Sequence, residues 1–111
     1  MATRYRVLGQ KEPAANTDWD IYAVNGTKDA VISCITVANL DADNAATYRI
    51  SVRPDGATLT DDMYIAYNIQ IDPASSVALN LGLTLNQNDV LTVRSSSGTV
   101  SFGVFGTEID V

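Results

Sequence analysis

The sequence predicts an all-β fold, an antiparallel β-sandwich or jelly-roll of about eight strands, in a single domain over residues 1–111. Apolar and polar residues alternate in one segment after another, which is the period of a strand with one face on a core. No segment shows helical periodicity. Short polar turn sequences recur at intervals of about 8 to 12 residues, a spacing typical of sandwiches and barrels.

The alternation is clearest in four segments, residues 48–53, 63–71, 77–85 and 100–105. Segment 30–40 differs because apolar residues occupy both of its faces. Ile35 and Val37 share one face, and Ile32 and Cys34 share the other. This pattern is typical of a central strand covered on both sides, either by the domain itself or by a neighbouring subunit. Shorter strands are predicted at residues 5–8, 19–24 and 90–95.

The core is predicted from the apolar phase of these strands. Its members are Val37, Ile50, Val52, Ile65, Tyr67, Ile69, Leu79, Leu81, Leu83, Val93, Phe102 and Val104. Outside the strands, Pro13 and its small, polar neighbours predict an irregular surface crossing. Residues 1–18 and 107–111 are expected to be free arms that reach toward a neighbouring protein, since termini without internal pairing partners are mobile.

The composition is globular and acidic. Hydrophobic residues make up 46% of the chain, and 13 acidic against 7 basic residues give a net charge of −6. This charge repels the phosphate backbone, so no nucleic-acid partner is expected. No apolar run approaches the ~18 residues of a membrane helix, and the N-terminal segment lacks the apolar stretch of a secretion signal. The sequence therefore predicts neither a membrane partner nor secretion by the general route.

Catalytic and metal-binding residues are not expected. The chain contains no histidine, which removes the commonest general base and metal ligand. Its only cysteine, Cys34, lies in an apolar run and is interpreted as a small hydrophobic residue. The acidic pair Asp18 and Asp20, and the pair Asp61 and Asp62, resemble carboxylates of a glycosidase or a cation site. Short loops leave little material for a substrate cleft, so we predict no enzyme.

A calcium loop is also rejected. Asp41, Asp43 and Asn44 resemble the start of such a loop, but Ala46 and Val52 stand where glycine and glutamate would complete it. Turn formation explains these residues better. No cofactor and no metal are therefore predicted.

Tyr64 is the predicted contact residue of a subunit interface. It lies on the polar phase of its strand and would approach Arg49 and Arg53 if neighbouring strands pair. Ile32 and Cys34 are added from the two-faced segment 30–40. That segment also predicts a homo-oligomer, with a trimer as the leading expectation.

Several segments together resemble a family of small virion proteins of tailed bacteriophages. They are residues 8–10, 29–39, 46–57 and 64–65, Phe102 and residues 105–109. The resemblance covers nearly the whole chain, but its motifs are strand and turn patterns, not functional signatures. The family is expected to carry a proline soon after the strand at residues 21–24, where this chain has Asn25-Gly26.

The resemblance implies a structural component of the virion. Within that class it implies a capsid decoration or cement protein that bridges and stabilises subunits of the major capsid protein. A neck, tail or baseplate component that attaches fibres is the alternative from the same class. The alternatives from other classes are a carbohydrate-binding module and a small lyase-like enzyme, which would need an exposed aromatic patch or a carboxylate cleft.

Overall fold

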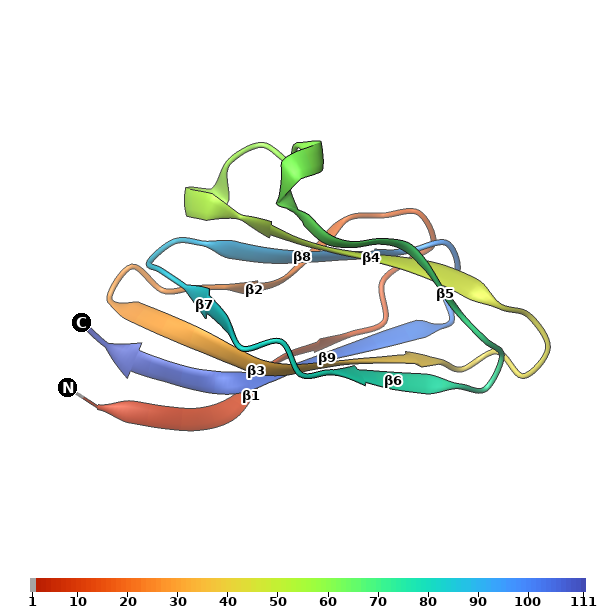
Figure 1. Cartoon of the computed structure of the whole chain (residues 1–111), viewed down its shortest axis with the longest axis horizontal. Helices are drawn as coiled ribbons and strands as arrows, with labels where there is room; N and C mark the ends of the chain where they lie inside the picture. Colours follow the sequence, from red (N-terminus) through yellow and green to blue (C-terminus); the bar gives the residue numbers. More distant parts are fainter. Residues whose placement is uncertain (1) are drawn as a thin grey trace.

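Two antiparallel sheets pack face to face in the computed structural model, which describes residues 2–111 (Figure 1). One sheet has the order β1 (Thr3–Lys11), β9 (Val100–Asp110), β3 (Lys28–Asn39) and β6 (Ser76–Leu79), with β7 (Leu83–Leu85) also paired to β3. The other has the order β2 (Trp19–Ala23), β8 (Val90–Ser95), β4 (Ala46–Arg53) and β5 (Tyr64–Ile71). The 3-10 turns η1 (Pro54–Gly56) and η2 (Asp61–Met63) lie between β4 and β5. The predicted all-β sandwich is confirmed.

β3 lies in the middle of its sheet, since it pairs with β9 on one side and with β6 and β7 on the other. However, only one of its two faces is covered within the domain, and Cys34 on the other face is half-buried. A bulge between Ile32 and Cys34 shifts its phase by one residue. Ile32 before the bulge and Ile35 after it are therefore both fully buried. The apolar residues on both phases of this segment follow largely from the bulge.

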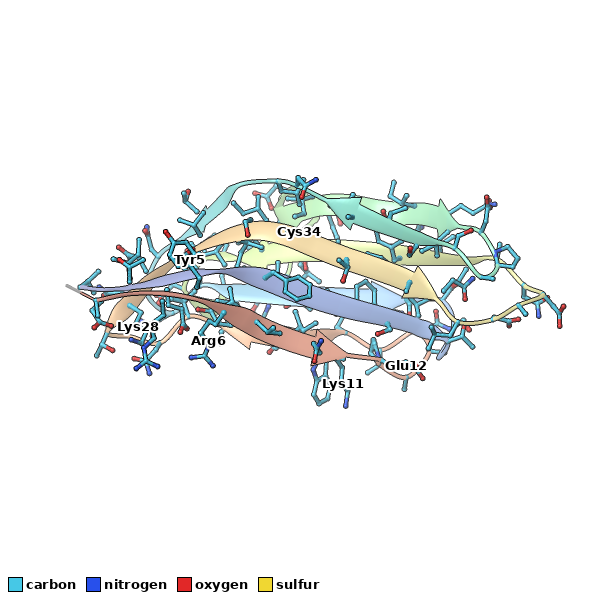
Figure 2. All side chains as sticks on the ribbon, turned by 90° about the horizontal axis from the view of Figure 1, so that it is seen from below. Tyr5, Arg6, Lys11, Glu12, Lys28 and Cys34 are labelled. Atoms are coloured by element: carbon cyan, nitrogen blue, oxygen red, sulfur yellow. The ribbon has the colours of Figure 1, made fainter. Side chains whose placement is uncertain are left out.

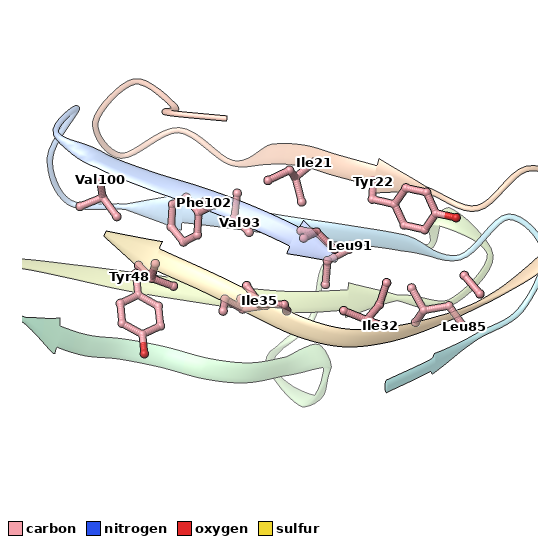
Figure 3. Packing of buried hydrophobic residues seen from close by; sticks show 14 of the residues in the cluster. Ile21, Tyr22, Ile32, Ile35, Tyr48, Leu85, Leu91, Val93, Val100 and Phe102 are labelled. Atoms are coloured by element: carbon pink, nitrogen blue, oxygen red, sulfur yellow. The ribbon is translucent and has the colours of Figure 1, made fainter. Parts of the chain in front are cut away.

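The core lies between the sheets and contains much of the predicted set (Figure 3). Val37, Ile50, Val93, Phe102 and Val104 are buried, and Val52, Leu79 and Leu83 pack against them. Phe102 meets Tyr48 edge to face, with ring centroids 6.4 Å apart. Residues from both sheets therefore interdigitate around these two rings.

The prediction of burial is wrong for four residues of the expected core, because they are 42–52% exposed. They are Ile65, Tyr67, Ile69 and Leu81. The left-handed backbone of Asn68 (φ +50°) accompanies an irregular register of β5 against β4. Gly82 (φ +61°) interrupts the predicted strand 77–85, so that it forms β6 and β7 instead. Both segments lie at sheet edges, where alternation does not ensure burial.

One side of the sandwich is closed by β1 and β2. A Cβ atom at Gly9 would lie 2.4 Å from the carbonyl oxygen of Ile21, so only glycine permits this approach. Nearby, the Tyr22 hydroxyl donates to Oε2 of buried Glu108 at 2.7 Å, and Arg6 Nη1 lies 3.1 Å from Oε1. Burial and the Glu108 carboxylate raise the pKa of Tyr22 above its ordinary value. These contacts tie the two sheets together on this side.

The prediction of free arms is wrong for the described residues. Met1 lies outside them, but Thr3–Lys11 forms β1 and pairs with β9 along its length. Residues 107–110 belong to β9, which pairs with both β1 and β3. The two ends of the chain are partners for each other, which sequence periodicity does not reveal. Within residues 2–111, no helical segment has the length and hydropathy needed to cross a membrane.

The turn after β3 is organised by Asp41. Its Oδ1 accepts hydrogen bonds from the backbone N–H groups of Asp43 at 2.8 Å and Asn44 at 3.1 Å. The Asn44 side chain donates to Oδ2 at 3.3 Å. The N–H of Asp43 chiefly, together with Asn44, holds the pKa of Asp41 below its ordinary value. Turn formation thus accounts for the residues that resemble a calcium loop.

We expect the Asp41 turn to make stability depend on pH. Because the pKa of Asp41 is lower in the folded than in the unfolded chain, its contribution is present above about pH 4 and is lost as pH falls through the folded value. Asp41→Ala should therefore lower the free energy of unfolding at pH 7 and cause a smaller loss at pH 3. Urea unfolding at the two pH values measures both differences. Asp43→Asn is the control, and an equal loss at both pH values for Asp41→Ala would contradict the assignment.

Candidate interaction surface

The side of the sandwich opposite β1 and β2 is open. There β5 and β6 are the outer strands of the two sheets, and an apolar groove of about 280 Å³ lies between them. The residues that line this groove are Tyr48, Ile50, Ile65, Ala66, Ile69, Leu79 and Leu81. Tyr48 and Ile50 are core residues and form its floor. The groove therefore brings the hydrophobic core to the surface.

The open side also lacks charge. Across residues 63–85, Asp72 is the only charged residue, although 18% of the whole chain is charged. By contrast, β1 carries arginine and lysine residues and β2 carries Asp20. Charged side chains on outer strands commonly prevent unwanted strand pairing. An uncharged edge beside an apolar groove is typical of a surface that another protein covers.

An aromatic cluster lies next to the groove and consists of Arg49, Tyr64 and Tyr67. The two tyrosine rings meet edge to face, with centroids 4.8 Å apart. Cζ of Arg49 lies 4.3 Å from the ring centroid of Tyr67 and 6.0 Å from that of Tyr64. Because the rings are nearly perpendicular, at 78°, they do not present one shared flat face to a sugar ring. An arginine packed against tyrosine rings in this way is typical of protein contacts.

Of the predicted interface residues, Arg49 and Tyr64 are together in this cluster, but Arg53 is not. Arg53 Nη2 lies 2.9 Å from Oδ2 of Asp20, and its Nε donates to Oγ1 of Thr92 at 3.1 Å. Its Nη1 also donates to the carbonyl oxygens of Gly56 and Ala57. Arg53 therefore fixes the η1 turn to β2 and β8, which is a structural role.

Ile32 and Cys34 occupy different positions. Ile32 is fully buried in the core, so the prediction of an interface contact at Ile32 is wrong for the folded chain. Cys34 is half-buried on the outer face of its sheet, which Figure 2 shows together with Tyr5. Its neighbour across the ladder is Phe105, and the next is Val7. We call Val7, Phe105 and Cys34 the outer row.

The two acidic pairs of the sequence, Asp18 with Asp20 and Asp61 with Asp62, lie in ion pairs and a turn. Within residues 2–111, no group of three or more acidic, cysteine or histidine residues is placed to hold a metal ion. Asp20 pairs with Arg53, and Asp18 lies 3.5 Å from Arg94. Asp61 and Asp62 form the exposed η2 turn. These carboxylates are therefore used in ion pairs and turns.

Sequence reasoning missed the groove as a surface, because it assigned Ile65, Ile69 and Leu81 to the core. Tyr67, which completes the aromatic cluster, was assigned to the core as well. The absence of charge in residues 63–85 was the available signal, since a solvated pair of strands usually carries charged residues. Alternation alone does not distinguish a core face from a face that a partner covers.

Solved structures of phage capsid proteins resemble this chain. Two structures of a pentameric capsid protein isolated from metagenomic phage sequences each share 23% identity, with a TM-score of 0.41. The match covers 98% of this chain but only 61% and 62% of those chains. The capsid of Ralstonia phage GP4 shares 12% identity with a TM-score of 0.45, over 98% of this chain and 83% of that one. No family model and no curated protein matches the chain.

Proposed function

We propose that this chain is a non-enzymatic structural protein of a phage virion, acting as a capsid decoration or cement protein. In this role it bridges neighbouring subunits of the major capsid protein and stabilises the shell. The observation that carries the proposal is the open side, where an uncharged edge and an apolar groove reach the core. The sequence resemblance to small virion proteins supplies the kind of partner.

The strand order supports the same class. Strands β1, β3 and β9 lie in one sheet and β2, β4 and β8 lie in the other, so the chain passes from sheet to sheet at most of its connections. Strands β6 and β7 both pair with β3 and together take the place of one strand. We take this order to be a jelly-roll, an architecture used by viral capsid domains. The proposal places the chain in the same class as the phage capsid proteins whose structures it resembles, but it does not rest on that likeness.

The outer surface of the shell is the proposed location. A net charge of −6 suits a solvent-facing protein, whereas a lining next to packaged DNA would be repelled by it. We further propose a homo-oligomer, with a trimer as its stoichiometry, formed through the outer row and Tyr5. Val7 is 48% exposed and Tyr5 85% exposed, so this face offers apolar area for a second copy.

The groove gives a direct test of shell binding. Leu81 is 42% exposed at the groove, so Leu81→Asp should fold normally yet place an unpaired charge in the contact. We expect its affinity for shells of the major capsid protein to fall by about tenfold or more. Co-sedimentation of purified protein with shells that lack it measures this affinity.

Leu40→Asp is the matched control, because Leu40 is 63% exposed and does not line the groove. It should co-sediment as the unchanged protein does. Equal binding of the Leu81→Asp variant would exclude the groove as the contact. Failure of the unchanged protein to bind any shell would exclude the capsid role itself.

A further inference from the structure

Two arginines lie directly opposite each other on neighbouring strands. Arg49 of β4 and Arg94 of β8 are register partners in the antiparallel ladder. Like charges at directly opposed positions destabilise a sheet. The chain has only 7 basic residues and a net charge of −6, so two opposed arginines are a local concentration of positive charge on an acidic protein.

A carboxylate among the described residues neutralises only one of these two charges. Arg94 Nη1 lies 3.5 Å from Oδ1 of Asp18. Within residues 2–111, no carboxylate oxygen lies within 4 Å of the Arg49 guanidinium. Arg49 Nε donates to Oδ1 of Asn68 at 2.8 Å, and the Tyr67 ring packs against the guanidinium. These contacts fix its orientation, and no acceptor within residues 2–111 is hydrogen-bonded to its two terminal nitrogens, which are available to a ligand.

The two arginines line a small polar cavity of about 30 Å³. Its other walls are uncharged, and they are formed by Asn16, Thr47, Asn68, Ser95 and Ser96. The walls are fixed by backbone contacts: the Asn16 N–H donates to the Ser95 carbonyl oxygen at 2.7 Å, and the Thr47 N–H donates to Ser96 Oγ at 2.9 Å. The cavity is thus a preformed, electropositive place on an acidic protein.

We propose that this cavity is a carboxylate-binding site, in which Arg49 and Arg94 hold an acidic side chain of a partner protein. The guanidinium group matches the two oxygens of a carboxylate better than any other side chain does. A volume near that of one water admits one oxygen of a carboxylate, with the rest of the acidic side chain lying outside the cavity. Tyr67 beside Arg49 adds apolar surface for the chain that carries the carboxylate. The site does not require that partner to be a shell protein.

The test uses the full chain labelled with ¹⁵N and three probes followed by NMR. They are a capped peptide of alternating glycine and glutamate, its glycine and glutamine counterpart, and inorganic phosphate. The glutamate peptide should shift the side-chain N–H signals of Arg49 and Arg94, and the glutamine peptide should not. The double variant Arg49→Gln, Arg94→Gln should lose at least tenfold in affinity for the glutamate peptide.

Arg4→Gln is the matched control, since Arg4 is exposed on β1 and does not line the cavity. It should bind the glutamate peptide as the unchanged protein does. Thermal unfolding checks that the double variant remains folded, because the two substitutions also remove the ion pair with Asp18 and the contact with Tyr67. Shifts with the glutamate peptide, with or without a response to phosphate, support the site. A response to phosphate alone would assign a free small anion and overturn the partner assignment, and no response at either arginine would overturn the site.

Discussion

Gly106→Ala should destabilise the protein by about 3 kcal/mol or more, with a fall in Tm of about 10 °C or more. Gly106 lies in β9, between Arg6 of β1 and Ile32 of β3. A Cβ atom there would lie 2.1 Å from the Val31 carbonyl oxygen and 3.1 Å from Cα of Ile32. Both atoms belong to the backbone of the central strand, so they cannot rotate away as a side chain could. Thermal unfolding followed by circular dichroism measures the effect.

Gly98→Ala is the matched control for this substitution. The nearest atom to a Cβ at Gly98 is the Ala15 backbone nitrogen, at 4.0 Å. This variant should therefore change the free energy of unfolding by no more than about 0.5 kcal/mol. A Gly106→Ala protein as stable as Gly98→Ala would show that β9 and β3 are farther apart than described.

Leu91→Ala should cost about 2 to 5 kcal/mol of unfolding free energy. Leu91 is fully buried in the core (Figure 3). It lies in β8, between Tyr22 of β2 and Val52 of β4. Removing its side chain leaves a cavity in the centre of the core, which the surrounding strands cannot close. Urea unfolding gives the free energy directly.

Leu81→Ala makes the same chemical change at an exposed position and separates burial from residue type. Leu81 is 42% exposed beside Gly82, so we expect a cost of about 1 kcal/mol or less. Equal losses for the two variants would contradict the described core, because they would mean that Leu81 is as buried as Leu91.

The alternation of the sequence predicted strands well, because the period of side chains in a strand is a local property. It did not predict phase shifts that arise from one residue, such as the bulge after Ile32 or the left-handed backbone of Asn68. It also did not separate outer strands from central ones. Ile65 and Ile69 alternate as regularly as core residues do, yet β5 has a neighbour on one side only.

Contacts between distant segments were the least predictable part of the site. Arg49 and Tyr64 were expected to meet because β4 and β5 are consecutive strands, and they do. The opposition of Arg49 and Arg94 depends on the register between β4 and β8, which alternation leaves undefined. The hydrogen bond that buried Glu108 accepts comes from Tyr22, which lies in the other sheet, so alternation could not predict it either. Register and sheet order therefore had to come from the structure.

A cryo-EM map of the particle of the phage that encodes this protein tests its proposed role most directly. The account predicts copies spread over the outer surface of the capsid at the junctions between capsomers, with the groove between β5 and β6 facing the major capsid protein. Density for the protein only at the neck, tail or baseplate would contradict the decoration role and favour fibre attachment. Absence of the protein from the particle would contradict the virion assignment altogether.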